Sequence, residues 1–178
     1  MYSETDIINW KTHRNDSDKK TCFVTCKSDF PMICDILKDC NDIAYISIES
    51  SDNCAKYLKF SHDNSHYLPD ADNVCNVEFD DVEHDIVVMQ DIAAYVITRP
   101  QAYKICEFID NNIDKHIIIH CRAGQSRSQA VYSYITTVYP DIYEFNEINK
   151  INPCLTPNIE VKSKLMKYQY SKIYSEND

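Results

Sequence analysis

The stretch HIIIHCRAGQSRSQAVYSYITTV, from His116 to Val138, contains the pattern that decides the fold. Its three consecutive isoleucines, 117–119, are typical of a short strand that is buried on both faces of a sheet. After a loop around Gly124, apolar side chains recur at helical spacing, and the predicted helix stops before Pro140. This order of strand, loop and helix places the loop at the carboxyl end of a strand, where α/β proteins bind their ligands.

The first half of the chain also alternates between strand and helix patterns. Thr21–Cys26 and Asp42–Ile48 are short β-rich runs, and Val74–Phe79 is a third. Between the first two runs lies a helical pattern with one apolar face, formed by Ile33, Ile36, Leu37 and Cys40. The polar stretch 61–73 is predicted to be a loop.

Before the stretch 116–138, a capping box of Thr98 and Gln101 predicts the start of another helix. Its apolar face would consist of Ala102, Ile105, Cys106 and Ile109, and it would end near Asn111 and Asn112. The apolar run 86–97 before it fits a helix or a strand equally well. The alternation predicts an α/β fold: a three-layer sandwich with a central, mainly parallel sheet flanked by helices.

Length and composition limit the classes of protein that the chain can represent. Its 178 residues fit one domain, 1–178, in which the polar residues 1–20 are expected to be frayed. A net charge of −10 argues against nucleic acid as a partner, because phosphate backbones are bound by clustered lysine and arginine. No apolar run approaches the roughly 18 residues of a membrane span, and the start does not resemble a signal peptide. We therefore expect a cytoplasmic location and no membrane partner; the oligomeric state is not predicted.

Rare residues converge on one loop. The chain has a single glycine, Gly124, where average usage of about 7 % would give roughly a dozen. It has four arginines, and two of them, Arg122 and Arg127, flank that glycine. The nine cysteines are odd in number and scattered, as expected of reduced thiols. One of them, Cys121, lies at the start of the loop.

The loop carries residue types suited to phosphate chemistry. Backbone N–H groups of residues 122–126 (Arg122, Ala123, Gly124, Gln125, Ser126), together with the positive end of the helix dipole, would bind a phosphate dianion. Arg127 offers a planar fork to two phosphate oxygens. A thiolate is favoured in that field, so Cys121 is expected to be a nucleophile. The hydroxyl of Ser128 could donate to this thiolate, and His120 is expected to support the loop.

The full string H-C-x-x-G-x-x-R-S resembles the loop of the cysteine-dependent protein phosphatases, in particular their compact dual-specificity members. The resemblance extends over roughly Asp42–Tyr168 and includes the segment 79–81, 101–110 as the helix before the loop and 157–165 as the closing helix. It implies a phosphorylated protein as substrate, a phosphocysteine intermediate and no cofactor or metal. The only tryptophan is Trp10, so the Trp-Pro-Asp loop of the larger tyrosine-specific enzymes is absent from the sequence.

The family also uses a carboxylic acid to protonate the leaving oxygen, and the resemblance assigns this role to Asp81. If Phe79 faces the core, the two-residue period of a strand turns Asp81 in the same direction and Asp80 away from the loop. Asp80 and Asp91 remain rivals. The leading hypothesis is a protein phosphatase for phosphotyrosine, with phosphoserine and phosphothreonine as further candidates. The alternatives are a phosphoprotein-binding pseudophosphatase and an RNA 5′-phosphatase.

Two other groups of residues have side chains that could bind a metal or form a disulfide. His62 and His66 lie in a polar loop without a third close ligand, so a metal site there is disfavoured. Cys75 or Cys106 could lie near Cys121 and form a disulfide with it on oxidation, although Cys106 also fits a small core residue on its helix.

Overall fold

The fold is taken from a computed structural model that describes residues 1–51, 66–82, 87–89, 92–153 and 156–175. Within these ranges, the helices are all too short or too polar to cross a membrane.

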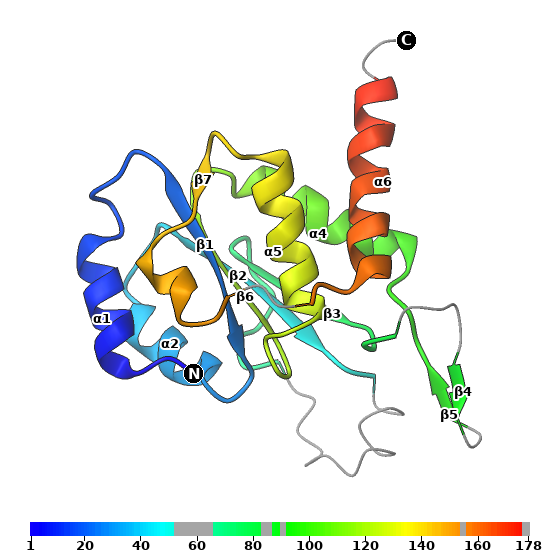
Figure 1. The fold of residues 1–178 in the computed structure, drawn as a ribbon, viewed down its shortest axis with the longest axis horizontal. Coiled ribbons are helices and arrows are strands. Elements are labelled where there is room, and N and C mark those ends of the chain that lie inside the picture. The colour runs from blue at the N-terminus through cyan, green and yellow to red at the C-terminus, as the bar shows by residue number, and fades with distance from the viewer. Residues whose placement is uncertain (52–65, 83–86, 90–91, 154–155, 176–178) are drawn as a thin grey trace.

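A parallel sheet of five strands forms the centre of the molecule (Figure 1). Its spatial order is β3-β2-β6-β1-β7, and every neighbouring pair is parallel. The strands are β1 (Lys20–Cys26), β2 (Ile43–Glu49), β3 (Val74–Glu78), β6 (His116–Cys121) and β7 (Tyr143–Glu144). The three strands predicted in the first half of the chain are confirmed to within one residue at each end. All six residues of β6 are buried, because this strand lies in the middle of the sheet.

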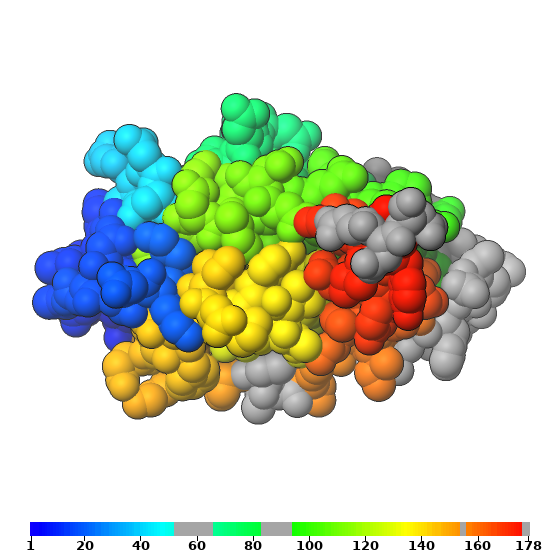
Figure 2. All heavy atoms as spheres, turned by 90° about the horizontal axis from the view of Figure 1, so that it is seen from above, coloured from blue at the N-terminus to red at the C-terminus, as the bar shows by residue number. Residues whose placement is uncertain are grey.

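Helices cover both faces of the sheet, which confirms the three-layer α/β prediction. On one face α4 (Arg99–Asn111), α5 (Arg127–Val138) and α6 (Ile159–Ser175) pack on alternate strand residues such as Val24, Ile46 and Ile119. On the other face α1 (Glu4–His13) and α2 (Phe30–Leu37) pack on the intervening residues, such as Phe23 and Ile118, with the short 3₁₀ helix η1 (Glu147–Lys150) beside them. Figure 2 shows α5 in yellow at the centre of its face, with α4 in green and α6 in orange and red next to it.

The helix before β6 begins and ends as predicted. Thr98 is the N-cap of α4 and exchanges capping-box hydrogen bonds with Gln101, and Asn112 follows as the C-cap. Its four predicted core residues are all buried. In contrast, the ambiguous apolar run contains two short antiparallel strands, β4 (Val87–Met89) and β5 (Ile92–Ala94).

The expectation of a frayed start is wrong. Residues 4–13 form α1, which begins with a capping box between Ser3 and Asp6 and buries Ile7 and Trp10. The ring of Trp10 lies 5.1 Å from that of Phe23, centroid to centroid. Two apolar residues three positions apart anchor this helix, and the polar residues around them concealed it in the sequence.

Candidate active site

The loop connects the central strand to the start of α5. β6 ends at Cys121 and α5 begins at Arg127, so the intervening backbone lies at the positive end of the helix. Cys121 is buried, and its Sγ lies 3.0 Å from the Oγ of Ser128 in the first turn of the helix. The structure therefore brings together the thiol and the hydroxyl that the sequence singled out.

Gly124 is required for the path of the loop. Its φ is +68°, in the left-handed region that favours glycine. A Cβ at this position would also lie 2.8 Å from the backbone oxygen of Thr25, at the neighbouring strand. The amides of Gln129 and Asn152 donate to the carbonyl of Gly124. Any side chain here would therefore strain the loop and push it away from β1.

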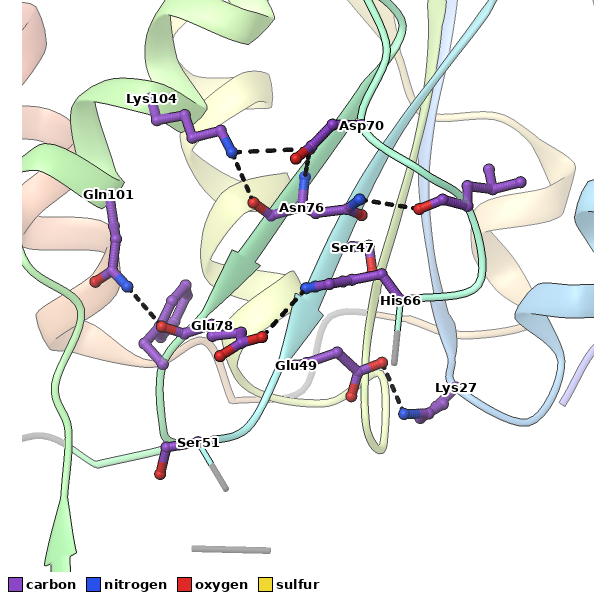
Figure 3. A network of polar contacts seen from close by, with 12 residues as sticks. Lys27, Ser47, Glu49, Ser51, His66, Asp70, Asn76, Glu78, Gln101 and Lys104 are labelled. Atoms are coloured by element: carbon purple, nitrogen blue, oxygen red, sulfur yellow. Dashed lines mark hydrogen bonds and ion pairs between the residues drawn. The ribbon is translucent and has the colours of Figure 1, made fainter. Parts of the chain in front are cut away.

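Arg127 is buried, and the ends of two strands hold its guanidinium in place. Its Nη1 donates to the carbonyl of Phe79 at 2.7 Å, and also to the carbonyl of Glu49 and the Oγ of Ser50. Its Nε is buried without a hydrogen-bond partner among the described residues. The buried carboxylate of Glu49 is neutralised by Lys27, with Oε1 and Nζ 2.9 Å apart (Figure 3). The guanidinium of Arg127 is thus held in place by the chain after β2 and β3, and its Nε–H has no partner among the described residues.

The outer part of the loop faces solvent. Arg122, Ala123 and Gln125 are exposed, and Ser126 is half-buried. The backbone N–H of Lys27 donates to the carbonyl of Arg122, which ties the loop to the end of β1. An anion could therefore approach the backbone of the loop from outside.

Asp81 is exposed and lies against the loop. Its Oδ1 accepts a hydrogen bond of 2.6 Å from the Oγ of Ser126 and another of 2.9 Å from the Nδ2 of Asn158. Asn158 also caps α6 by accepting from the N–H of Val161, and its own N–H donates to the carbonyl of Ser126. One asparagine thus fixes the relative positions of the carboxylate, the loop and α6.

The two rival acids differ from Asp81. Asp80 is buried, and its carboxylate accepts three hydrogen bonds: two from the N–H and Oγ of Ser51 and one from the N–H of Tyr95. Its carboxylate thus binds Ser51 and Tyr95, and the sequence did not indicate that it would be buried. Asp91 lies outside the described residues.

His120 is buried and directly precedes Cys121 in the sequence. Its Nε2 lies 2.7 Å from the Oγ of Ser47 on β2, and its ring packs on Phe30 at a centroid distance of 4.0 Å. Burial is the main factor that lowers its pKa, to about 3, so the ring is neutral. This placement agrees with a supporting role for the loop.

The cysteine in register with Cys121 is Cys26, at the end of the neighbouring strand β1. Cys75 lies on β3, which β2 separates from β6, and the thiol of Cys106 contacts the carbonyl of Leu165. Burial raises the pKa of Cys75 to about 11 and that of Cys106 to about 12, so both thiols stay protonated at neutral pH. Cys75 is thus a wrong prediction for the redox partner, because sequence spacing does not reveal which strands are neighbours. Cys106 is a buried core residue of α4, as its place on the helix face predicted.

In the part of the chain that the structure describes, no three histidine, cysteine or acidic residues are grouped as metal ligands would be. His62 lies outside the described residues. His66 is described, and it contacts Ser47 instead, with its Nδ1 2.7 Å from the Oγ.

No protein-family model and no curated protein matches the chain. Several solved structures align with it, and two of them show how low the similarity is. The human tyrosine phosphatase-like serine/threonine/tyrosine-interacting protein has 19% identity and a TM-score of 0.42, covering 83% of this chain and 87% of that one. DUSP15 has 15% identity and a TM-score of 0.43, covering 88% and 87%. The α/β fold is established by the parallel sheet itself.

The sequence reasoning missed three residues of the site: Ser47, Glu49 and Asn158. Ser47 and Glu49 lie on a strand far from the loop in sequence, so only the pairing of β2 with β6 reveals them. Asn158 had a signal, since asparagine is a preferred N-cap before a helix.

Proposed function

We propose that the protein is a cysteine-dependent phosphatase that hydrolyses phosphotyrosine in proteins, with phosphoserine and phosphothreonine as further candidate substrates. The observation that carries the proposal is the contact of 3.0 Å between the Sγ of Cys121 and the Oγ of Ser128 at the start of α5. A thiol, a hydroxyl and a helix N-terminus meet there, which is the environment in which a cysteine acts as a nucleophile.

The phosphate dianion would bind in the loop. Backbone N–H groups of residues 122–127 and the helix dipole would attract it, and the Nε of Arg127 supplies a buried donor that has no partner among the described residues. An unsatisfied buried donor costs roughly 1–3 kcal/mol, so a phosphate oxygen that accepts from Nε would recover this cost on binding. Arg127 would also stabilise the charge on the equatorial oxygens in the transition state.

The reaction would proceed in two displacements at phosphorus. The thiolate of Cys121 attacks, the bond from phosphorus to the substrate oxygen breaks, and Asp81 gives that oxygen a proton. Water then attacks the phosphocysteine while the carboxylate of Asp81 takes up a proton, and inorganic phosphate and the thiolate are released. Ser128 would donate a hydrogen bond to the departing sulfur, which its position already permits.

The charge of the chain favours a protein substrate over RNA. An RNA 5′-phosphatase needs basic residues along the nucleic-acid chain, and the net charge here is −10. A binding module without turnover would share the fold, and only a turnover measurement separates it from an enzyme.

The decisive experiment measures release of phosphate from p-nitrophenyl phosphate and from a panel of phosphopeptides, with reducing agent and a chelator present. We expect turnover of the aryl ester and of phosphotyrosine peptides, and its abolition by Cys121→Ser. Tight binding of phosphopeptides to the wild-type protein without turnover would instead support the binding module.

A further inference from the structure

A pocket of about 740 Å³ lies between α1 and the chain that follows β7. Its volume falls in the range of roughly 300–1,000 Å³ that ligand pockets occupy. Figure 1 shows α1 in blue and η1 in orange, the two elements that form its sides. Both lie on the face of the sheet opposite α5, and none of the candidate active-site residues lines the pocket. The pocket is therefore separate from the candidate active site.

Both sides of the pocket are fixed to the same strand, β1. On the η1 side, the Nδ2 of Asn149 donates to the carbonyl of Cys22 at 2.7 Å. On the other side, Trp10 of α1 packs edge-on against the ring of Phe23. A pocket that is preformed in this way costs a ligand less free energy of ordering on binding.

Apolar side chains make up one part of the lining. Trp10 and Ile148 are buried there, and Ile151 is half-buried. Phe145, directly after β7, also lines the pocket, and it is 61% exposed. Covering an exposed ring removes apolar surface from water, which is favourable, and aromatic side chains are enriched in protein interfaces. The pocket can therefore bind an apolar side chain of a ligand against Phe145.

Carboxylates outnumber cationic groups in the rest of the lining. The carboxylates belong to Asp6, Asp16, Glu144 and Glu147. The basic residues are His13, which contacts Asp16, and Arg14, whose Nη2 lies 2.8 Å from the Oδ1 of Asp42. The net charge of −10 on the chain adds to the negative potential at the pocket. This potential favours a cationic partner and disfavours nucleic acid or an anionic membrane.

Two of the four carboxylates already have partners within the chain. Asp6 belongs to the capping box of α1, and the Oε1 of Glu147 lies 2.6 Å from the Nζ of Lys150. The side chain of Asp16 is 72% exposed, and Glu144 is half-buried. Asp16 and Glu144 are thus the carboxylates that are best placed to bind a cation from a partner.

We propose that this pocket is a docking site for a basic peptide segment of a partner protein. The segment would place an arginine or lysine beside Asp16 and Glu144, and an apolar side chain such as leucine against Phe145. Arginine and leucine in alternation would match both parts of the lining. The interaction is independent of the proposed phosphatase activity, because the loop around Gly124 takes no part in it.

The single tryptophan of the chain makes the proposal testable by fluorescence. Trp10 lines the pocket, so its emission should change when the pocket is occupied. The probe is a short peptide of alternating arginine and leucine, acetylated and amidated so that its ends are uncharged. We expect a saturable change in emission, and an affinity that falls as sodium chloride is added, because salt screens exposed charges.

Two control peptides separate the charged from the apolar contribution. One alternates glutamate and leucine, the other arginine and serine, and neither should give a saturable change. The absence of a saturable change with the arginine–leucine peptide would overturn the proposal, and so would equal affinity for either control peptide.

Substitutions in the lining locate the binding, with affinities measured by calorimetry. Asp16→Asn combined with Glu144→Gln should weaken binding by about two- to thirtyfold, the range that two exposed ion pairs produce. Phe145→Ser should weaken it by about fivefold or more, because leucine would lose its apolar contact. Glu107→Gln, at an exposed carboxylate of α4 on the other face of the sheet, should bind as the wild type does.

The pocket is not the site if neither lining variant weakens binding. An equal loss of affinity in Glu107→Gln and in the double variant would also overturn the proposal, because the peptide would then respond to the overall charge of the protein.

Discussion

The Oγ of Ser126 donates a hydrogen bond of 2.6 Å to the Oδ1 of Asp81, and this contact joins the candidate acid to the candidate phosphate-binding loop. Ser126 directly precedes Arg127, so the carboxylate is held beside the loop that would bind the phosphate. Asn158 holds the same oxygen from the other side.

Asp81→Asn should therefore reduce kcat in a way that depends on the leaving group. General acid catalysis contributes about 10²- to 10⁴-fold, so we expect a loss in this range with phenyl phosphate or phosphotyrosine. The loss should be much smaller with p-nitrophenyl phosphate, whose leaving group needs little protonation. Steady-state kinetics on the two esters measures the contrast.

Two matched variants serve as controls for Asp81. Asp80→Asn removes a carboxylate that holds Ser51 and Tyr95, so it should lower stability without the leaving-group dependence. Asp91→Asn should change neither kcat nor the dependence of kcat on the ester used as substrate. If Asp91→Asn alone shows the contrast, the assignment of the acid is wrong.

Much of the fold could be predicted from sequence because its signals are local. The isoleucine run of β6 and the capping box of α4 are read within a few residues, and both are confirmed. The loop was predictable for the same reason: its thiol, glycine and arginine lie within seven positions.

Contacts across the sheet could not be predicted. Ser47 meets His120 because β2 and β6 are neighbours in register, and Cys26 is paired with Cys121 for the same reason. The burial of Asp80 and the contact of Asp81 with Ser126 could not be predicted either, because the direction of a side chain after the end of a strand depends on the turn that follows.

Arg127→Lys should cause a large loss of activity although the positive charge is kept. Lysine has a single nitrogen, which cannot lie both at the place of Nη1, beside the carbonyls of Phe79 and Glu49, and at the place of Nε, where the phosphate would bind. We expect kcat/KM to fall by about 10²- to 10³-fold, the cost of losing one preorganised donor. Arg99→Lys, an exposed arginine of α4, is the control and should stay within a factor of two. Wild-type kinetics in Arg127→Lys would remove Arg127 from the site.

Peroxide should inactivate the protein reversibly, because the oxidised Cys121 can form a disulfide with Cys26. Peroxide oxidises the Cys121 thiolate to a sulfenic acid; the Cys26 thiol then attacks that sulfur, forming a disulfide and releasing water. Paired Cα atoms of neighbouring strands lie about 4.8 Å apart, within the range that disulfides span. Mass spectrometry without reduction should find the Cys26–Cys121 peptide, and dithiothreitol should restore activity.

The Cys26→Ser variant should instead become irreversibly over-oxidised at Cys121, while Cys75→Ser should behave like the wild type. Full recovery of Cys26→Ser after the same peroxide treatment would argue against this pairing.

Stability should fall with acid because His116 is buried and neutral. Its Nδ1 accepts from the N–H of Thr21 at 2.9 Å, and its Nε2 lies 3.1 Å from the Oδ1 of Asn15. Burial is the main factor that lowers its pKa to about 4, whereas the unfolded chain titrates near 6.5. Between these values the unfolded state binds more protons, so stability is lost as the pH falls through this window.

Urea unfolding at pH 7 and pH 5 measures this effect. One extra proton bound by the unfolded chain changes the free energy of unfolding by up to about 1.4 kcal/mol per pH unit. In His116→Gln the free energy of unfolding should depend less steeply on pH than in the wild type. In His13→Gln, a change at an exposed site, the dependence should be the same as in the wild type. An unchanged slope in His116→Gln would show that His116 does not titrate on unfolding.

The central claim is that Cys121 forms a covalent bond to phosphorus. Rapid acid quenching of the enzyme during turnover of ³²P-labelled phosphotyrosine peptide, followed by peptide mapping, tests it most directly. We expect label to be recovered on the peptide that contains Cys121. More label should accumulate in Ser128→Ala because the sulfur leaves more slowly, and none should be found in Cys121→Ser. Turnover by the wild type without label on this peptide, together with retained activity in Cys121→Ser, would contradict it.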